Sequence, residues 1–199
     1  MISVGRKEPP KGTMHMWYVM QVYTGTETEM CETCRAGIME EGEDVFVLLA
    51  EKMTKVGGVW SLVTARLFPG YVFVETDRIQ DFNRRMKKAG SLAKILRTGE
   101  EMTPLYPEEE TYFQKLGGRE HVVRYSQGYI EGEELVVTSG AMRHCRGKVK
   151  KVLRHKRLVV LEVAMMGRVM EVTVGMGIVA RQGNCEIARI KNQKITECI

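Results

Sequence analysis

The feature that most constrains the fold is a segment near the C-terminal end, residues 133–174, in which short apolar runs alternate with turn signals. Its runs rich in Val and Leu predict four β-strands, at residues 135–138, 148–153, 158–163 and 169–174. Four short strands cannot bury both of their faces as an open sheet. The segment therefore predicts a small closed β-barrel.

The loops of this predicted barrel are densely charged. Residues 141–157 contain eight Lys or Arg and no acid. Because like charges repel one another, such a run favours a polyanionic partner, and neighbouring histidines would assist as neutral partners. The candidate nucleic-acid-binding residues are Arg143, His144, Arg146, Lys148, Lys150, Lys151, Arg154, His155, Lys156 and Arg157.

The charge of the whole chain is unevenly distributed. The net charge of the 199 residues is +5, but residues 132–199 carry thirteen Lys or Arg against six acids, which leaves residues 1–131 slightly negative. Two halves of opposite sign suggest two partners of different kinds. The composition fits an ordinary globular protein, and the chain has no apolar run near the roughly 18–20 residues that span a bilayer. We therefore expect a cytoplasmic protein with no membrane partner.

The N-terminal half alternates predicted strands and helices. Strands are predicted at residues 16–23, 44–49, 59–66 and 93–96, and residues 67–75 are predicted to turn sharply and enter a further strand. Helices are predicted at residues 24–38, 77–89 and 107–117. Acids in first turns and apolar residues on one face support the helices. Helices interleaved with an antiparallel sheet predict an α+β fold with a ferredoxin-like α/β sandwich.

Two thiols, Cys31 and Cys34, lie three residues apart in the first predicted helix. Such a pair can form half of a zinc site or a redox pair. A zinc site needs two further clustered ligands. The remaining candidates are scattered singly, as His15, His121, Cys145 and Cys185. We therefore expect buried structural thiols that face a sheet, in reduced form, and no bound metal.

The sequence contains no recognisable catalytic constellation. It has no Gly-rich phosphate loop and no metal-ligand spacing. His144 beside Cys145 could suggest a base and a nucleophile, but adjacent residues in such a loop generally point apart. We expect a protein that is not an enzyme and needs no cofactor.

Three stretches in this order resemble the NusG family of transcription factors: WYVMQV at residues 17–22, FPGYVFVE at 68–75, and a KOW-like motif at 137–163. The MMGRVMEV that follows matches the usual continuation of the motif. SQGYIEG at residues 126–132 resembles the LoaP branch, a specialised group of NusG paralogues.

The resemblance implies a domain organisation. A ferredoxin-like N-terminal domain would span residues 16–117, and an SH3-like β-barrel, the KOW domain, would span residues 132–180. A linker of residues 118–131 would join them. Residues 1–15 would be a flexible leader, and residues 181–199 a C-terminal extension that is weakly helical at best.

The resemblance also implies a partner for the N-terminal domain. In NusG-like proteins this domain docks an apolar patch on the clamp helices of the β′ subunit of RNA polymerase and bridges the cleft towards the β subunit. Tyr71 and Phe73 alternate with Val72 and Val74, so one pair is expected to form an exposed patch. The candidate polymerase-binding residues are Gln21, Phe68, Tyr71, Phe73, Ile95 and Leu96.

The loop before Gly147 departs from the family pattern. Housekeeping members carry a Phe where Cys145 stands, and their loop contacts a ribosomal protein or the terminator Rho. A thiol offers far less apolar area than a phenyl ring. The resemblance therefore predicts a monomeric processive antiterminator whose KOW domain binds a nascent RNA leader hairpin. Coupling of polymerase to ribosome or Rho is the alternative, and a ribosome-associated KOW protein would lack the N-terminal motifs.

Overall fold

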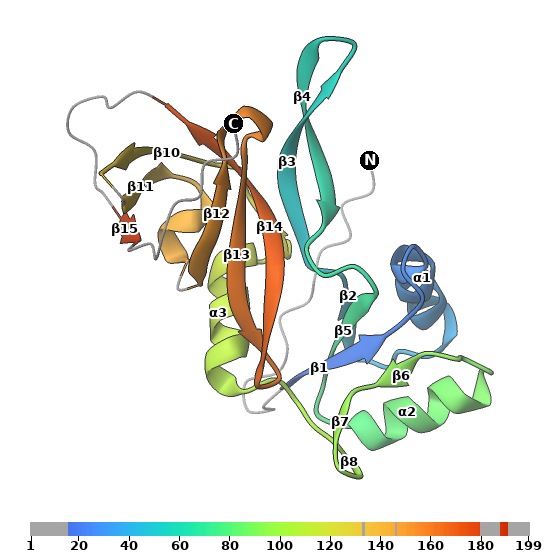
Figure 1. Cartoon of the computed structure of the whole chain (residues 1–199). Helices are drawn as coiled ribbons and strands as arrows, with labels where there is room; N and C mark the ends of the chain where they lie inside the picture. The colour runs from blue at the N-terminus through green and yellow to red at the C-terminus, as the bar shows by residue number, and fades with distance from the viewer. Residues whose placement is uncertain (1–15, 133, 146, 180–187, 191–199) are drawn as a thin grey trace. The chain divides into compact units, whose positions relative to one another are not determined.

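The computed structural model describes residues 16–132, 134–145, 147–179 and 188–190 (Figure 1). Its contacts divide the chain into two compact units. The first contains the described residues up to Phe46 together with Tyr71–Pro104, and the second contains Val47–Gly70 and the described residues from Leu105 onwards. The predicted leader, residues 1–15, lies outside the described residues, as does most of the predicted C-terminal extension.

The first unit is built on a four-stranded antiparallel sheet in the order β2-β5-β1-β6. Its strands are β1 (Met16–Gln21), β2 (Asp44–Phe46), β5 (Tyr71–Thr76) and β6 (Lys94–Ile95). Helix α1 (Glu27–Gly37) joins β1 to β2, and α2 (Ile79–Lys88) joins β5 to β6. Two βαβ halves with this strand order form the predicted ferredoxin-like sandwich. A small hairpin, β7 (Arg97–Thr98) and β8 (Glu101–Met102), follows.

Aromatic packing fills the core of the first unit. Trp17 and Phe46 meet edge to face with ring centroids 4.7 Å apart, and Phe46 stacks on Phe73 at 5.7 Å. The two helices lie side by side, since Arg85 of α2 donates a hydrogen bond to the backbone oxygen of Ile38, the C-cap of α1 (2.6 Å). The apolar faces predicted for both helices are largely buried, although Met30 is half-buried and Ala89 is exposed.

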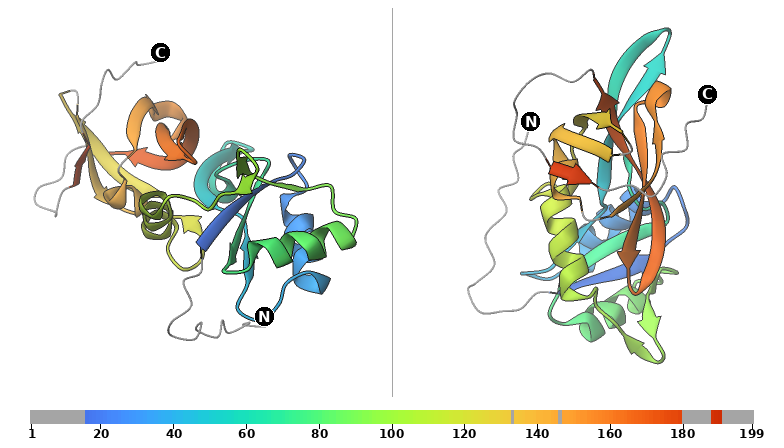
Figure 2. Two further views of the ribbon diagram at one scale, coloured as in Figure 1. Left: turned by 90° about the horizontal axis from the view of Figure 1, so that it is seen from below. Right: turned by 60° about the vertical axis from the view of Figure 1, so that its left-hand side comes forward.

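The second unit combines a long hairpin, a helix and a curved sheet (Figure 2). The hairpin consists of β3 (Leu49–Val56) and β4 (Val59–Arg66), and β9 (Val122–Val123) pairs with β3 in parallel. Helix α3 spans Pro107–Gly117, as predicted. The curved sheet has the strand order β12-β13-β14-β10-β11-β15.

The curved sheet is the SH3-like β unit that the sequence predicts. Its strands are β10 (Ser126–Glu131), β11 (Glu134–Ser139), β12 (Lys148–Leu153), β13 (Leu158–Met165), β14 (Arg168–Ile178) and β15 (Ala188–Ile190). Two 3₁₀ turns flank β12, namely η1 (Ala141–His144) before it and η2 (Arg154–Lys156) after it. All four strands predicted in this segment are therefore confirmed.

Two expectations about this unit are wrong. Residues 126–131 of the predicted linker form β10, which pairs with both β11 and β14. Gly128 permits this close pairing, because a Cβ there would collide with the backbone oxygen of Val136. Residues 188–190, expected to be helical at best, form β15 and pair with β11.

The units also differ from the predicted domain boundaries. Hairpin β3–β4 and α3 lie in the sequence of the predicted N-terminal domain, yet they group with the C-terminal strands. Gly175 of β14 lets β3 approach, because a side chain there would collide with the backbone oxygen of Glu51. Only tertiary contacts of this kind could reveal the grouping.

Candidate nucleic-acid and protein interfaces

The candidate nucleic-acid-binding residues lie along β12 and in the turns at both of its ends. Arg143 and His144 in η1 are exposed, as are Arg154, His155 and Lys156 in η2. The six residues of β12 separate the two turns by roughly 20 Å. Arg146 lies outside the described residues. The structure thus arranges the predicted basic run as two cationic ends with a strand between them.

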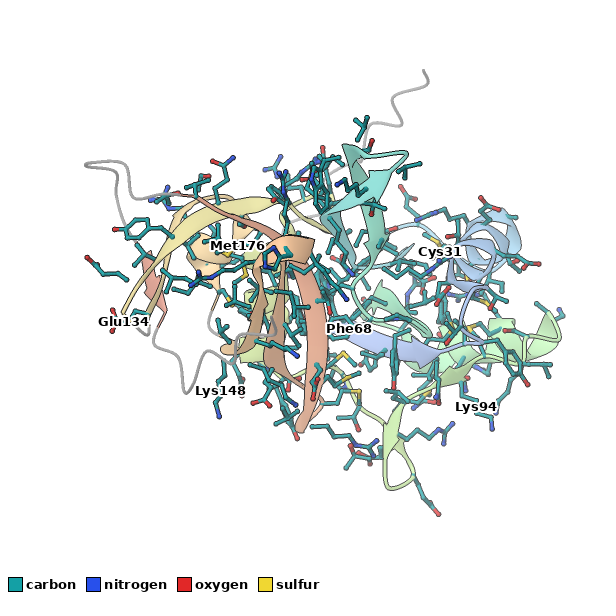
Figure 3. All side chains as sticks on the ribbon, turned by 45° about the horizontal axis from the view of Figure 1, so that its top comes forward. Cys31, Phe68, Lys94, Glu134, Lys148 and Met176 are labelled. Atoms are coloured by element: carbon teal, nitrogen blue, oxygen red, sulfur yellow. The ribbon has the colours of Figure 1, made fainter. Side chains whose placement is uncertain are left out.

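The strand between the two ends is partly neutralised by acids that are distant in sequence. Lys148 pairs in register with Glu162 of β13, and Glu162 pairs with Glu171 of β14. The ammonium group of Lys148 lies 3.9 Å from Glu162, and that of Lys150 lies 3.8 Å from Glu162 and hydrogen-bonds to Glu171. Figure 3 shows Lys148 projecting from β12. The sequence run contains no acid, so only the fold reveals this compensation.

One predicted RNA-reading arginine already has a partner. The guanidinium carbon of Arg157 lies 4.5 Å from the ring centroid of Trp60 on β4, a cation–π contact. Arg157 is also held at its backbone, which adopts φ 54° and accepts a hydrogen bond from the N–H of Met176 (2.9 Å). Trp60 was missed by sequence reasoning, because it lies in the hairpin almost a hundred residues earlier.

The η1 end is attached to α3. The thiol of Cys145 lies 3.5 Å from the hydroxyl of Tyr112 on α3, and 3.7 Å from the backbone oxygen of Gly147, to which it donates. Burial raises the pKa of the Cys145 thiol, so the group is a protonated packing element and not an activated nucleophile.

An open cavity of about 510 Å³ adjoins the η1 end. It lies beside the C-terminal end of α3, and His144 lines it together with Lys115, Arg119 and Arg124. Arg124 is engaged by Glu51 and Glu120. Lys115 and Arg119 extend the cationic surface of this end, and neither was among the predicted residues.

The candidate polymerase-binding residues differ in exposure. Tyr71 and Leu96 are half-buried and Gln21 is exposed. The expected exposure of three others is wrong: Phe73, Phe68 and Ile95 are 0%, 2% and 6% exposed. Phe73 packs against Phe46 and Trp17, and Phe68 meets Phe113 edge to face at 5.4 Å. The strict in–out alternation fails because β5 is central in its sheet and both of its faces are covered.

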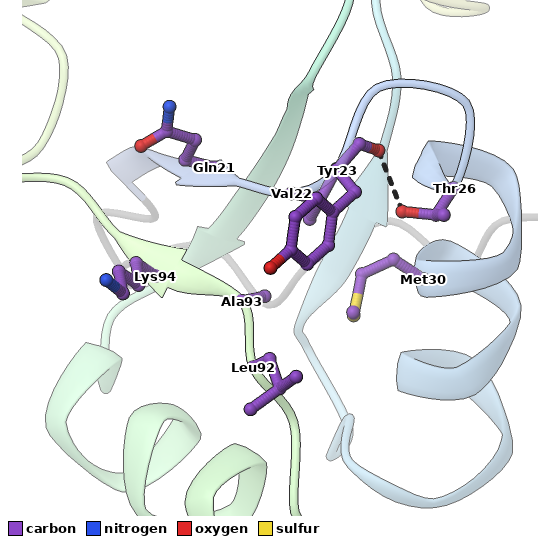
Figure 4. A pocket seen from close by; sticks show the side chains of 8 residues that line it. All are labelled: Gln21, Val22, Tyr23, Thr26, Met30, Leu92, Ala93 and Lys94. Atoms are coloured by element: carbon purple, nitrogen blue, oxygen red, sulfur yellow. Dashed lines mark hydrogen bonds between the residues drawn. The ribbon is translucent and has the colours of Figure 1, made fainter.

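A pocket of about 300 Å³ lies in the first unit at the C-terminal end of β1 (Figure 4). In register, Gln21 faces Tyr71 on one side and Lys94 on the other, and both Gln21 and Lys94 line the pocket. The remaining lining residues are Val22, Tyr23, Thr26, Met30, Leu92 and Ala93. The side chains of Tyr23 and Leu92 are 77% and 79% exposed and line the same pocket, so they form an exposed apolar patch, a feature that can mark a partner site.

Comparison with known proteins identifies the family. A family model described as "Transcription termination factor nusG" matches residues 15–114, half of the chain. This chain belongs to the NusG family. It is a NusG-like transcription termination/antitermination factor, and its homologues are transcription factors and not enzymes.

Two NusG relatives align over most of their length. "Transcription termination/antitermination protein NusG" of Haemophilus influenzae is 28% identical over 172 residues, which cover 83% of this chain and 93% of the relative. The protein of the same name from Pasteurella multocida is 25% identical over 163 residues, covering 78% and 89%. A solved structure titled "Domain interaction in Thermotoga maritima NusG" matches with a TM-score of 0.48 and 20% identity over 82% of this chain and 96% of that one.

The CxxC pair of this NusG-family chain is buried in α1. Burial raises the pKa of Cys31 to about 11 and that of Cys34 to about 12, so both thiols are protonated near neutral pH. Within the described ranges, no three His, Cys, Asp or Glu side chains are grouped in a way that could hold a metal ion. In the same ranges, no helix is both long and apolar enough to cross a membrane.

Proposed function

We propose that this NusG-family protein is a processive antiterminator. Its first unit binds RNA polymerase, and its second unit binds a hairpin in the nascent leader RNA. The observation that carries the RNA part is the placement of exposed cations at both ends of β12, in η1 and η2. Phosphates neutralised by such side chains release condensed counterions, which supplies sequence-independent affinity.

An RNA stem is the target that suits this arrangement. A-form RNA hides its bases in a deep, narrow groove, so a protein grips a stem through phosphates and 2′-hydroxyls. Two cationic turns about 20 Å apart can reach phosphates on successive parts of one stem. Sequence preference would then come from unpaired bases, read by arginine side chains such as Arg143 and Arg154.

The polymerase contact is proposed at the row formed by Lys94, Gln21 and Tyr71 and at the pocket beside it. Polar edges around an apolar hollow are typical of protein–protein interfaces. Exposed Tyr23 and Leu92 add apolar area to this surface. We propose that this surface binds the clamp helices of the β′ subunit of RNA polymerase. The β subunit, on the other side of the polymerase cleft, would be a second partner. Buried Phe73, two residues after Tyr71 on β5, would support this surface, whereas Phe68 packs against Phe113 in the second unit.

Coupling to the ribosome or to Rho through the loop at Cys145 is less well supported. The thiol is half-buried against Tyr112 and offers little apolar surface to a partner. Removing a phenyl-sized anchor from an interface typically costs about 2 kcal/mol or more. The loop is therefore better suited to present its neighbouring cations, Arg143 and His144, to RNA.

The proposal is tested by transcription with purified bacterial polymerase on templates that carry leader–terminator regions. We expect the protein to increase read-through only on templates whose leader encodes an intact hairpin. Arg154→Glu combined with Lys156→Glu should abolish this effect, while the variant still co-purifies with polymerase. Read-through that persists after the leader hairpin is deleted would contradict the proposal.

A further inference from the structure

We propose that hairpin β3–β4 and turn η2 form one binding surface for unpaired RNA next to a stem. We call it the hairpin–turn surface, and it consists of Lys55, Trp60, Arg154, Lys156 and Arg157. Phosphates of the RNA strand would lie on Lys55, Arg154 and Lys156, with a base against the accessible part of Trp60. The inference rests on the proposed RNA-binding function and adds to it a second RNA-binding element, far away in sequence.

The first observation is that the hairpin and the turn are in contact. Arg157 follows η2 directly, and its guanidinium lies over Trp60 at 4.5 Å. Its left-handed backbone and its hydrogen bond from Met176 fix the position of the turn. A guanidinium held over an indole presents its positive charge next to an aromatic ring. The contact therefore places a fixed positive charge beside a half-buried aromatic ring.

The second observation is that the hairpin is fixed to the curved sheet at its base. β3 approaches β14 at Gly175, where no side chain intervenes. Glu51, the hairpin's only acid, accepts hydrogen bonds from the backbone N–H of Tyr125 (2.8 Å) and from Arg124 (2.6 Å). With this carboxylate neutralised, the charge that the hairpin presents is positive.

The third observation concerns which side chains share a face. Lys55 and Trp60 pair in register, so they project from the same face of the hairpin, the face that meets Arg157. The next pair, Val56 and Val59, projects from the opposite face and is exposed. Leu62, two residues after Trp60, projects from this face as well and is 53% exposed. Cations, an indole and an apolar side chain therefore share the hairpin–turn surface, and single-stranded RNA offers phosphates to the first and base faces to the others.

An indole among cations matches unpaired RNA better than a duplex. Single strands are bound by grooves of positive charge in which bases stack on aromatic side chains, whereas a stem offers no free base face. The η2 end already belongs to the surface proposed to grip a stem. A strand that leaves this stem would meet Lys55 and Trp60 next.

The test uses the full-length protein and an RNA stem-loop with a single-stranded extension, selected in vitro from a randomised pool on the wild-type protein. The same stem-loop trimmed to a blunt end and a DNA strand of the extended sequence serve as comparison probes. We expect Trp60→Ala to weaken binding of the extended RNA roughly 5- to 100-fold. Lys55→Glu should weaken it as well and lower the salt dependence. Neither change should affect the trimmed RNA, and Trp60→Phe should retain most of the affinity.

Lys87→Glu on α2 of the first unit is the matched control, since it makes the same charge change at an exposed site. Circular dichroism checks that each variant is folded. If Trp60→Ala unfolds, the binding of the extended RNA by Lys55→Glu still tests the inference. If Arg154→Glu with Lys156→Glu weakens binding but Lys55→Glu and Trp60→Ala do not, the inference is overturned and the proposed function stands. If selection yields no RNA ligand, the proposed function fails. Equal affinity for the DNA strand would overturn the assignment to RNA.

Discussion

The carboxylate of Glu109 on α3 accepts a hydrogen bond from the backbone N–H of Met166, at 2.9 Å, in the turn between β13 and β14. A second hydrogen bond comes from the N–H of Gly167 at 3.3 Å. Although Gly167 is exposed, Glu109 is almost fully buried, so the two hydrogen bonds are partly shielded from water. Helix α3 is thereby joined to strands that lie more than fifty residues later in the chain.

The first prediction concerns this contact. Glu109→Ala should lower the free energy of unfolding by about 1–3 kcal/mol, because two partly shielded backbone donors lose a charged acceptor. Urea denaturation measures the change. Glu108→Ala, an exposed change one residue earlier, is the control and should be nearly neutral. Equal midpoints for the two variants would show that the contact contributes nothing.

The second prediction separates the cations of β12 from those of η2. Lys150→Ala should weaken RNA binding only slightly, because Glu162 and Glu171 already compensate this ammonium group. Lys156→Ala in the exposed η2 turn should weaken it more and reduce the slope of log affinity against log salt by roughly 0.7–0.9. Titration at several salt concentrations measures both. A larger loss at Lys150 would mean that RNA displaces the two glutamates.

The third prediction separates surface from core on β5. Phe73→Ala should cost about 3–5 kcal/mol of stability, because it removes a fully buried ring. Tyr71→Ala should leave the fold intact and weaken polymerase binding. Circular dichroism and co-purification with polymerase distinguish the two effects. A folded Tyr71→Ala protein that retains full polymerase binding would remove Tyr71 from the interface.

The fourth prediction concerns the buried thiols. In the unfolded chain Cys31 and Cys34 ionise near the ordinary thiol pKa of 9.0, whereas the folded values are about 11 and 12. Above pH 9 the unfolded state therefore loses protons that the folded state keeps, and stability falls between about pH 9 and 12.

The double variant Cys31→Ala with Cys34→Ala should lose this part of the alkaline dependence, at a modest cost in stability at pH 7. Urea midpoints of wild type and variant from pH 7 to 10.5 measure the difference. Parallel pH profiles would contradict the assignment. Stoichiometric zinc in wild-type protein purified without chelators would overturn a purely structural role for the pair.

Much of the local structure could be predicted from the sequence, although β3 (Leu49–Val56) is absent from the predicted strands. Strands 148–153 and 59–66 and helix α3 were predicted with their observed bounds, because apolar periodicity, Gly turns and a proline at the helix start act over a few residues. The ferredoxin-like plan and the basic character of the barrel loops follow from the same local signals.

The tertiary structure alone decided which residues share a surface. Charge compensation at Lys150 needs Glu171, the orientation of Arg157 needs Trp60, and the burial of Cys145 needs Tyr112. Each pair joins segments that no local rule links, because hydrogen bonds, ion pairs and ring contacts depend on distance in space. The burial of Phe73 could likewise not be predicted from the sequence, because alternation along one strand does not tell whether the second face of its sheet is covered.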